Sequence, residues 1–340
     1  MAVNENDPAG FDLIGFGEAM VLFQPEGALR SAERTTVHVA GAELNLCAAA
    51  ARAGLRTAYC SRVGADPLGE KIVDHAASFG IATDLVTTDD QRPTGLFLKD
   101  VRPDGIRRVH YYRRGSAASA LSDEDANRVL ASRPRLVAVS GITSALSDSA
   151  RDAVRTLLTQ APAFGVQVAY DPNLRPALGD LDAQIAEARS LLPHVSMLLI
   201  GTDEAEPLFG TAEPEAVFRA ARAAGVAETV LKAGPDGCWY ADGDVATHLP
   251  SAATTVVDPV GAGDAFAGAY LAGRVRGATP AGAAWLAGQF AAAIVARPGD
   301  TDGLPTPTAA ATLLTTALSP TPPIHPTPLS AHPTPLSARS

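Results

Sequence analysis

The 340-residue chain is poor in cysteine and has no excess of positive charge. Its three cysteines, Cys47, Cys60 and Cys238, are too far apart in sequence to predict a disulfide framework or a zinc knuckle. Lys and Arg number 27 against 37 Asp and Glu, a net charge of -10, which is no electrostatic footprint for nucleic acid or anionic lipid. We therefore expect a protein of a reducing compartment that binds no nucleic acid.

The chain also lacks a long hydrophobic run. Its first residues, MAVNENDPAG, contain no basic region followed by an apolar one. The longest apolar stretch, around 283–296, is interrupted by Gly288 and Gln289 and is too short to span a bilayer. We expect a cytoplasmic protein with no membrane partner.

Three common nucleotide or metal motifs are missing as well. Gly15 and Gly17 invite a dinucleotide fingerprint, but Met20 stands where its third glycine belongs, which argues against a Rossmann cofactor site. No GxxxxGK followed by Ser or Thr occurs, and no HExxH, which excludes a P-loop and a zincin site.

The composition is instead that of a protein with a large core, because 46% of its residues are hydrophobic. Short β-branched runs alternate with longer Ala-rich helical windows, which predicts an α/β fold with a largely parallel sheet. The expected strands are 13–16, 57–63, 136–140, 166–171, 197–200 and 229–232. The expected helices are 44–53, 68–79, 148–161, 181–191, 214–224, 265–276 and 281–295.

One segment breaks this alternation. Residues 94–101 and 106–113 are typical of two strands, and the Arg-Pro-Asp-Gly sequence between them favours a hairpin turn. We interpret the hairpin as a lid. Because side chains alternate along a strand, Tyr111 and Arg113 share one face, which is placed to meet a ligand.

The last residues, 319–340, are dominated by Pro, Thr, Ser and Ala and contain HPTPLSA twice in tandem. Such a composition predicts a disordered tail, because it cannot bury enough apolar surface to order itself. The two histidines of the repeat could suggest a metal site, but the composition favours a solvated tail with a duplicated stretch.

The most informative stretch is VVDPVGAGDAFAG, residues 256–268. Gly261, Ala262 and Gly263 lead into Asp264 and then an Ala-rich helix, so backbone N–H groups and a helix N-terminus could together receive a phosphate, with Asp264 as a proton acceptor. The alternative is a tight turn with Asp264 as an ordinary helix cap. The residues alone leave both interpretations open.

This stretch resembles the nucleotide-side signature of the ribokinase-like (phosphofructokinase B type) carbohydrate kinases. Other parts of that family's pattern occur in the family's order. The sugar-side segment is 40–45, followed by Gly64, Asp66 and Gly69, and the nucleotide-side turn contains Lys232, Gly234 and Gly237. Motifs in this order are more specific than any one of them.

The resemblance implies a ribokinase-like doubly wound sheet flanked by helices, with a small β lid. The kinase domain would span 11–318, with the lid strands inserted within 18–40 and 92–116. It further implies ATP and magnesium, with a monovalent cation as an additional candidate, and a homodimer formed through the lid.

Residue roles also follow from the resemblance alone. Asp264 is implied as the catalytic base, beside an anion hole formed by Gly261, Ala262 and Gly263. The implied substrate-binding residues are Gly41, Asn45, Phe97, Tyr111, Arg113, Arg175 and Asp264. The implied nucleotide-binding residues are Lys232, Gly234, Gly237, Gly261, Gly263 and Gln289. Glu204 would organise magnesium-bound water.

Three segments resemble the 2-keto-3-deoxygluconate kinases within the family: YYRRGSAA at 111–118, DPNLR at 171–175 and RPGDTDGLP at 297–305. A sugar acid carries a carboxylate that a guanidinium binds bidentately, whereas ribose and fructose carry no such charge. The expected reaction is ATP-dependent phosphorylation of the terminal hydroxyl of 2-keto-3-deoxygluconate, giving 2-keto-3-deoxy-6-phosphogluconate. The alternatives are a fructokinase or ribokinase, and a non-catalytic nucleotide- or sugar-binding regulator.

Four positions depart from the family pattern. Ala40 replaces the first glycine of the sugar-side pair, and Gly201 replaces an asparagine three residues before Glu204. Phe97 stands where this subgroup has a tyrosine, which removes a hydroxyl that could bond the substrate. Gln289 replaces an asparagine expected near the adenine.

Overall fold

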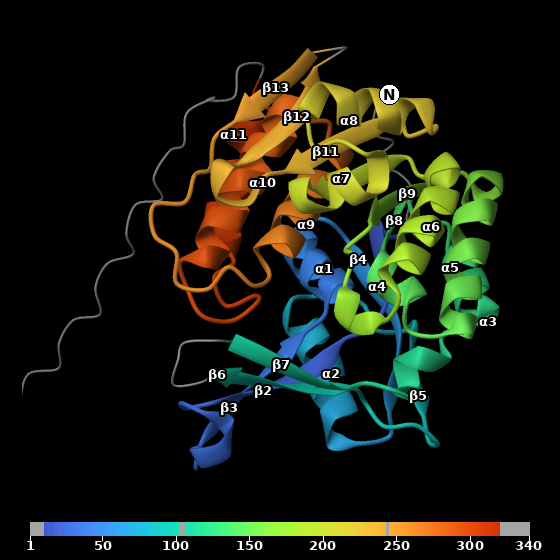
Figure 1. Cartoon of the computed structure of the whole chain (residues 1–340), viewed down its shortest axis with the longest axis vertical. Coiled ribbons are helices and arrows are strands. Elements are labelled where there is room, and N and C mark those ends of the chain that lie inside the picture. The colour runs from blue at the N-terminus through green and yellow to red at the C-terminus, as the bar shows by residue number, and fades with distance from the viewer. Residues whose placement is uncertain (1–9, 102–106, 243–244, 320–340) are drawn as a thin grey trace, which may run out of the picture.

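The computed structural model describes residues 10–101, 107–242 and 245–319, which form a large sheet flanked by helices and a smaller sheet below it (Figure 1). The strands are β1 Leu13–Phe16, β2 Met20–Pro25, β3 Thr35–Ala40, β4 Thr57–Gly64, β5 Val86–Asp89, β6 Leu96–Val101, β7 Arg107–Tyr112, β8 Leu136–Ser140, β9 Gln167–Asp171, β10 Met197–Gly201, β11 Glu228–Lys232, β12 Cys238–Asp242 and β13 Val245–Leu249. The helices are α1 Ala42–Arg52, α2 Pro67–Ser78, α3 Asp123–Ala131, α4 Gly141–Ser144, α5 Asp148–Gln160, α6 Leu181–Leu191, α7 Thr202–Phe209, α8 Pro214–Ala223, α9 Ala262–Val275, α10 Pro280–Val295 and α11 Pro307–Ala317.

The large sheet has the order β13-β12-β11-β10-β9-β8-β1-β4-β5. From β11 to β5 neighbouring strands are parallel, and only β12 and β13 run antiparallel at one edge. The predicted parallel α/β architecture is confirmed, and the six predicted strands of this sheet match observed ones to within one residue at each end. The sequence analysis did not predict β5, β12 and β13.

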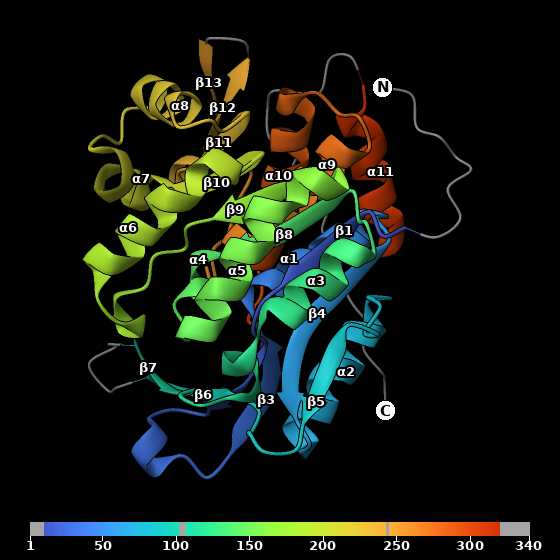
Figure 2. The same cartoon turned by 90° about the vertical axis from the view of Figure 1, so that its right-hand side faces the viewer.

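Both faces of the sheet are covered, because alternate residues of the central strands enter two separate cores. Leu13 and Leu136 pack with α1, α2, α9, α10 and α11, whereas Ile14 and Val137 pack with α3, α5, α6, α7 and α8. Figure 2 shows α3 and α5 on the second of these faces. Burial on both faces explains why these strands are apolar at every position rather than at every second one.

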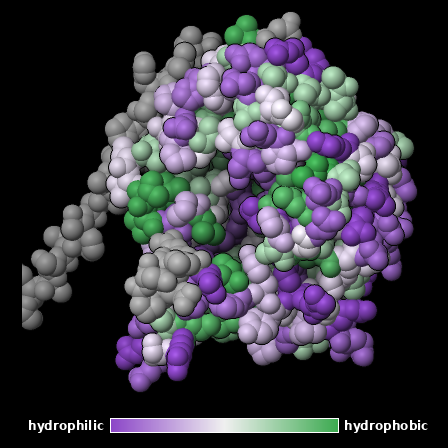
Figure 3. All heavy atoms as spheres, in the orientation of Figure 1, coloured by the Kyte–Doolittle hydropathy of each residue, from purple (hydrophilic) through white to green (hydrophobic). Residues whose placement is uncertain are grey.

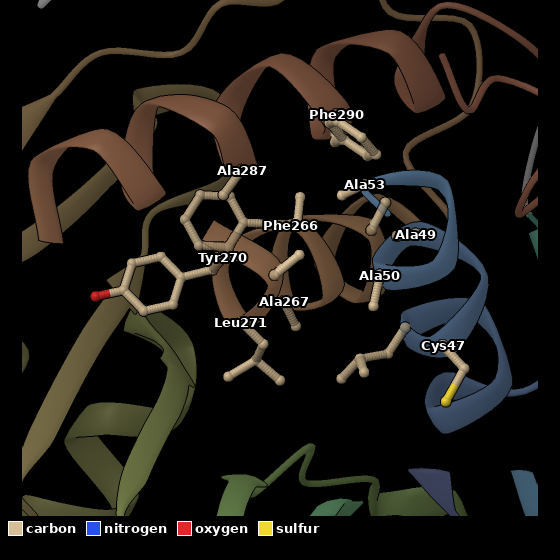
Figure 4. Packing of buried hydrophobic residues seen from close by; sticks show 14 of the residues in the cluster. Cys47, Ala49, Ala50, Ala53, Phe266, Ala267, Tyr270, Leu271, Ala287 and Phe290 are labelled. Carbon is tan, nitrogen blue, oxygen red and sulfur yellow. The ribbon is translucent and has the colours of Figure 1, made fainter. Parts of the chain in front are cut away.

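The first core holds α1 against α9 (Figure 4). The contact is made by small residues: Ala49 and Ala50 of α1 lie against Ala267 and Gly268 of α9. A side chain at Gly268 would place its Cβ 2.2 Å from the carbonyl oxygen of Leu46, so the two helices can approach this closely only with glycine there. This packing fixes the N-terminal turns of the two helices relative to each other.

Substitution of Gly268 by alanine should therefore destabilise the protein by about 1–3 kcal/mol, because the overpacked helices must move apart. Gly288 of α10 is the matched control, since a Cβ added there meets nothing within 4 Å. Gly288→Ala should stabilise by about 0.5–1 kcal/mol through helix propensity. Urea unfolding of both variants measures the difference; equal effects of the two substitutions would contradict the packing argument.

The smaller sheet has the order β3-β2-β6-β7, and its strands fall within 18–40 and 92–116. The hairpin β6–β7 is confirmed, with Phe97 opposite Tyr111 and Lys99 opposite Val109 in register. We refer to this sheet as the lid. The predicted turn at 102–105 lies outside the described residues, as does the tail from residue 320.

The three cysteines are free and buried. Burial raises the pKa of Cys60 and of Cys238 to about 12, which makes these thiols inert at neutral pH. Within the described ranges no helix has the length and apolar character needed to cross a membrane.

Candidate active site

A cavity of about 700 Å³ lies between the lid and the carboxyl ends of the parallel strands. Figure 3 shows the face of the molecule that is hollowed between the upper body and the lid, with hydrophilic side chains around the hollow. Asp171, Gly201 and Lys232, at the ends of β9, β10 and β11, line the cavity from one side. Ligands of open α/β sheets bind at these strand ends.

Asp264 lies in the first turn of α9, and its carboxylate faces the cavity. Asn45 Nδ2 of α1 donates to Asp264 Oδ2 at 2.9 Å and to Asp300 Oδ2 at 3.3 Å. Gly261 precedes the helix with φ +79°, a left-handed conformation, and a Cβ there would lie 2.6 Å from the carbonyl oxygen of Asp300. The glycine is thus required for the turn that brings Asp264 and Asp300 together.

Burial raises the pKa of Asp264 to about 7. This value already includes the nearby carboxylates of Asp300 and Asp171, which also raise the pKa, and the hydrogen bond from Asn45 and the ammonium of Lys232, which lower it. A carboxylate with a pKa near the working pH is suited to accept a proton during a reaction.

We expect kcat/KM for the sugar to rise with pH through about 7, because Asp264 acts as a base only when deprotonated. Asp300→Asn removes a neighbouring negative charge, lowers the pKa of Asp264 and should move the rising limb to lower pH. Asp302→Asn is the control, because Asp302 is largely exposed and pairs with His38 instead. The pH–rate profiles of the three proteins measure the effect, and identical midpoints would exclude Asp264 as the titrating group.

Lys232, Asp171 and Glu204 form a charged group beside Asp264. Lys232 Nζ contacts Asp171 Oδ2. Burial alone would lower the pKa of Lys232, but the carboxylates of Asp171 and Glu204 outweigh it and raise that pKa. Glu204 accepts backbone N–H bonds from Gly201 and Leu174, both at 2.8 Å, which holds the DPNLR segment against the end of β10.

The two arginines predicted to meet the substrate both line the cavity, but their surroundings differ. The side chain of Arg113 is 10% exposed, and its Nε donates to Glu18 Oε2 at 2.7 Å. Its guanidinium also lies 5.7 Å from the ring centroid of Tyr111. Glu18, which the sequence analysis missed, is fully buried, also accepts the hydroxyl of Ser116 and supplies the countercharge of Arg113.

Arg175 is exposed and follows Asn173, which adopts a left-handed conformation with φ +42°. Its backbone N–H and carbonyl are fixed by the amide of Gln184, both at 2.9 Å. In the described part of the chain its guanidinium donates only to the carbonyl of Leu174, at 3.2 Å, and forms no ion pair. Its charge is therefore available to an acidic ligand.

The face of the lid hairpin that meets the cavity carries Phe97, Lys99, Val109, Tyr111 and Arg113. The rings of Phe97 and Tyr111 lie 5.5 Å apart and form an apolar wall. Tyr112 points the other way and is 63% exposed, so the predicted alternation of Tyr111 and Arg113 against Tyr112 is confirmed.

Most of the predicted site residues lie in this one cavity, and three do not. The residues that line it are Gly41, Asn45, Phe97, Tyr111, Arg113, Arg175, Glu204, Lys232, Gly234, Gly261, Gly263 and Asp264. Ala262 turns its N–H to the carbonyl of Pro259 at 3.4 Å. Gly237 has φ +94° and shapes the turn between β11 and β12, and Gln289 is buried within α10.

The sequence analysis also missed Lys99, Asp171 and Asp300 as separate contributors to the site, although it quoted the segments of the last two. Two sequence features could have indicated Lys99. It is one of only three lysines in the chain, and it stands two residues after Phe97 on a lid strand, so the two side chains share a face. Its place over the cavity depends on the register of β6 with β2 and β7.

Residues 11–307 match the sequence profile of the pfkB family carbohydrate kinases. The chain belongs to the pfkB family. The 2-dehydro-3-deoxygluconokinase of Thermoproteus tenax is 35% identical to it over 312 residues, 90% of this chain and 95% of that protein. The 2-dehydro-3-deoxygluconokinase of Bacillus subtilis (strain 168) is 32% identical over 300 residues, 87% and 93% of the two chains.

A solved structure from E. coli, described as Ribokinase II in complex with ATP and Mg²⁺, has the same fold as this pfkB-family chain. It aligns with a TM-score of 0.80 and 23% identity, covering 90% of this chain and 99% of the other. The predicted ribokinase-like fold and carbohydrate kinase activity are confirmed.

Proposed function

We propose that the protein phosphorylates the terminal hydroxyl of 2-dehydro-3-deoxygluconate (also called 2-keto-3-deoxygluconate) with ATP, giving 2-dehydro-3-deoxy-6-phosphogluconate. The observation that carries the proposal is the pairing of two groups in one cavity: a carboxylate with a pKa of about 7 at a helix N-terminus, and Arg175, an arginine that forms no ion pair with any described residue. The kinase chemistry needs the first, and an acidic sugar explains the second. The relatives of this name extend over nine-tenths of the chain or close to it.

On the sugar side, Arg175 and the outer N–H groups of Arg113 would bind the substrate carboxylate, because a guanidinium offers paired donors to the two oxygens. Tyr111 and Phe97 would pack against the carbon chain. Asn45 and Gly41 would flank the reacting end, since Asn45 already bonds Asp264. A fructokinase or ribokinase would leave the charge of Arg175 unused.

On the nucleotide side, Lys232, Gly234, Gly261 and Gly263 line the part of the cavity that ATP would occupy. Gly263 is exposed and open to the cavity: Lys232 Nζ, at 4.0 Å, is the nearest atom to a Cβ added at this position. Its N–H and the N-terminus of α9 would receive the transferring phosphoryl group. Gln289 and Gly237 do not line the cavity, so they would support the nucleotide-binding surface from behind rather than contact ATP.

The residues present fit a magnesium ion that is held by nucleotide phosphates and water. Across the described residues, no three His, Cys, Asp or Glu side chains cluster to form a metal cage of their own. Magnesium in kinases keeps several waters and binds mainly to the phosphates, and Glu204 and Asp171 would accept hydrogen bonds from those waters. When bound, the ion neutralises phosphate charge.

The chain's own residues then carry the transfer. Asp264 accepts the proton of the terminal hydroxyl as its oxygen bonds to the γ-phosphorus. Asn45 keeps the carboxylate of Asp264 oriented during this step. The lid covers the substrate and excludes water, which limits ATP hydrolysis.

ADP release by the purified protein with magnesium-ATP and potassium tests the proposal. The acceptors are 2-dehydro-3-deoxygluconate, 2-dehydro-3-deoxygalactonate, gluconate, fructose and ribose. Turnover confined to the 2-dehydro-3-deoxy acids supports it. A preference for fructose or ribose would keep the kinase and remove the sugar-acid assignment, and turnover of none would favour a non-catalytic binding protein. Omission of potassium in a parallel series tests the monovalent cation.

We also propose a homodimer formed through the lid, in the cytoplasm, where ATP is available. Large apolar side chains that do not line the cavity are exposed on the lid, where Val37 is 39% and Tyr112 63% exposed. Light scattering on the purified protein tests this arrangement. A monomer, or a dimer that survives Tyr112→Glu unchanged, would contradict it.

A further inference from the structure

Lys99 of β6 is a half-buried lysine: its side chain is 16% exposed, but its Nζ is inaccessible to solvent and lacks a hydrogen-bond acceptor among the described residues. Its side chain lines the cavity from the lid. The nearest opposite charge is Asp258 Oδ2, 3.6 Å from Lys99 Nζ, which is too long for a hydrogen bond. An ammonium has three hydrogen-bond donors, and burying these donors without acceptors is unfavourable. The position is therefore suited to an anion that brings acceptor oxygens with it.

The acidic neighbours of Lys99 show which end of the cavity it serves. Asp258 begins the turn into α9, and its Oδ1 accepts the N–H of Val260 at 3.2 Å. Asp300 shares the Asn45 amide with Asp264. Burial raises the pKa of Asp300, and the ammonium of Lys99 is the largest influence that opposes this rise. Lys99 thus faces the turn at the N-terminus of α9 from the lid.

Two anions could occupy this position, the carboxylate of the sugar or a phosphoryl group of ATP. Arg175, whose charge has no acidic partner in the described part of the chain, belongs to the segment after β9. The two acidic neighbours of Lys99 named above, Asp258 and Asp300, lie in the turns that precede α9 and follow α10. The phosphoryl group is the anion that the helix N-terminus and Gly263 also receive, so Lys99 faces the same charge from the opposite side.

We propose that Lys99 is a catalytic residue of the lid whose ammonium binds the γ-phosphoryl group of ATP during transfer, an inference that rests on the proposed kinase function. The terminal hydroxyl oxygen forms a bond to the γ-phosphorus while the bond from that phosphorus to the β–γ bridging oxygen breaks. ADP leaves with that electron pair, and the hydroxyl proton goes to Asp264. Lys99 donates hydrogen bonds to the non-bridging oxygens and neither gains nor loses a proton.

The test compares Lys99→Met and Lys99→Arg with Lys71→Met. Methionine keeps the length of the side chain and removes its charge. Lys71 is an exposed lysine of α2 outside the active-site cavity, so it is a matched control. Steady-state kinetics give kcat and both KM values, and calorimetry gives the affinity for ADP and for ADP–aluminium fluoride, each with the sugar acid present. Thermal melting checks that the variants fold.

We expect Lys99→Met to lower kcat by about 10²- to 10³-fold, as for loss of one charge-stabilising donor. The affinity for ADP–aluminium fluoride should fall by a similar factor, whereas the affinity for ADP and the KM for the sugar acid should stay within about threefold of wild type. Lys99→Arg should restore part of kcat, and Lys71→Met should match wild type.

Two results would overturn the role of Lys99. One is a kcat of Lys99→Met within about threefold of wild type. The other is a raised KM for the sugar acid with kcat unchanged, which would place Lys99 at the carboxylate. Failure of the proposed function would give a different result, because the wild-type protein itself would then not phosphorylate the sugar acid. If wild type accepted another sugar, selective loss of ADP–aluminium fluoride affinity in Lys99→Met would still support the lid lysine.

Discussion

Asp264→Asn should lower kcat by about 10²- to 10⁴-fold, the usual contribution of a general base. Asparagine keeps the shape of the side chain and can still accept the N–H of Asn45, but it cannot take the hydroxyl proton. The fold should remain intact, because the charge of Asp264 is disfavoured by burial and by two acidic neighbours, all of which raise its pKa. Replacing this carboxylate with a neutral amide removes that unfavourable charge. Coupled measurement of ADP release gives kcat, and thermal melting gives stability.

Asp300→Asn is the control for this prediction. It removes a carboxylate that shares the same Asn45 amide and leaves the base in place. We expect its kcat at high pH to remain well above that of Asp264→Asn. Comparable losses in both variants would mean that the Asn45 network, rather than proton transfer to Asp264, carries the effect. Near wild-type turnover in Asp264→Asn would remove Asp264 from the chemistry.

Arg175→Ala should raise the KM for the sugar acid by about 10- to 100-fold, the equivalent of one or two hydrogen bonds to a charged group. The KM for ATP should not change, because the guanidinium faces the sugar part of the cavity in this proposal. Since Arg175 is exposed and pairs with no acidic side chain in the described ranges, its removal leaves no buried charge behind. Stability should stay close to wild type.

Arg113→Ala offers the contrast. Glu18 is fully buried and depends on Arg113 for its countercharge, so this substitution should destabilise the lid as well as weaken substrate binding. Steady-state kinetics with both substrates and urea unfolding separate the two arginines. An unchanged KM for the sugar acid in Arg175→Ala would require that its carboxylate bind elsewhere.

The sequence predicted the framework of the protein well for a physical reason. Strands such as β1 and β8 are buried on both faces, so they appear as short apolar runs, and the helices between them carry regular Ala-rich patterns. The edge strands β5 and β13, and β12 beside β13, were not predicted, because β5 and β13 carry few buried side chains and the signal of all three depends on their neighbours.

The site residues also divide into those that local sequence patterns indicate and those that depend on tertiary contacts. The chain by itself determined which residue types stand at the strand and helix ends: Asp264 after its glycines, the DPNLR segment and the tyrosines and arginines of the hairpin. These are local patterns, and turn geometry or helix N-termini give them chemical meaning without reference to distant residues.

Only the tertiary structure decided the state of those residues. Close packing of α1 on α9 at Gly268 brings Asn45 to Asp264, although they are 219 positions apart. Burial between Asp300, Asp171 and Asn45 sets the pKa of Asp264, and the partner Glu18 distinguishes Arg113 from Arg175. Lys99 reaches the cavity through the register of the lid strands. Desolvation and charge pairing depend on which distant side chains come into contact, and that is a property of the folded chain rather than of any local segment.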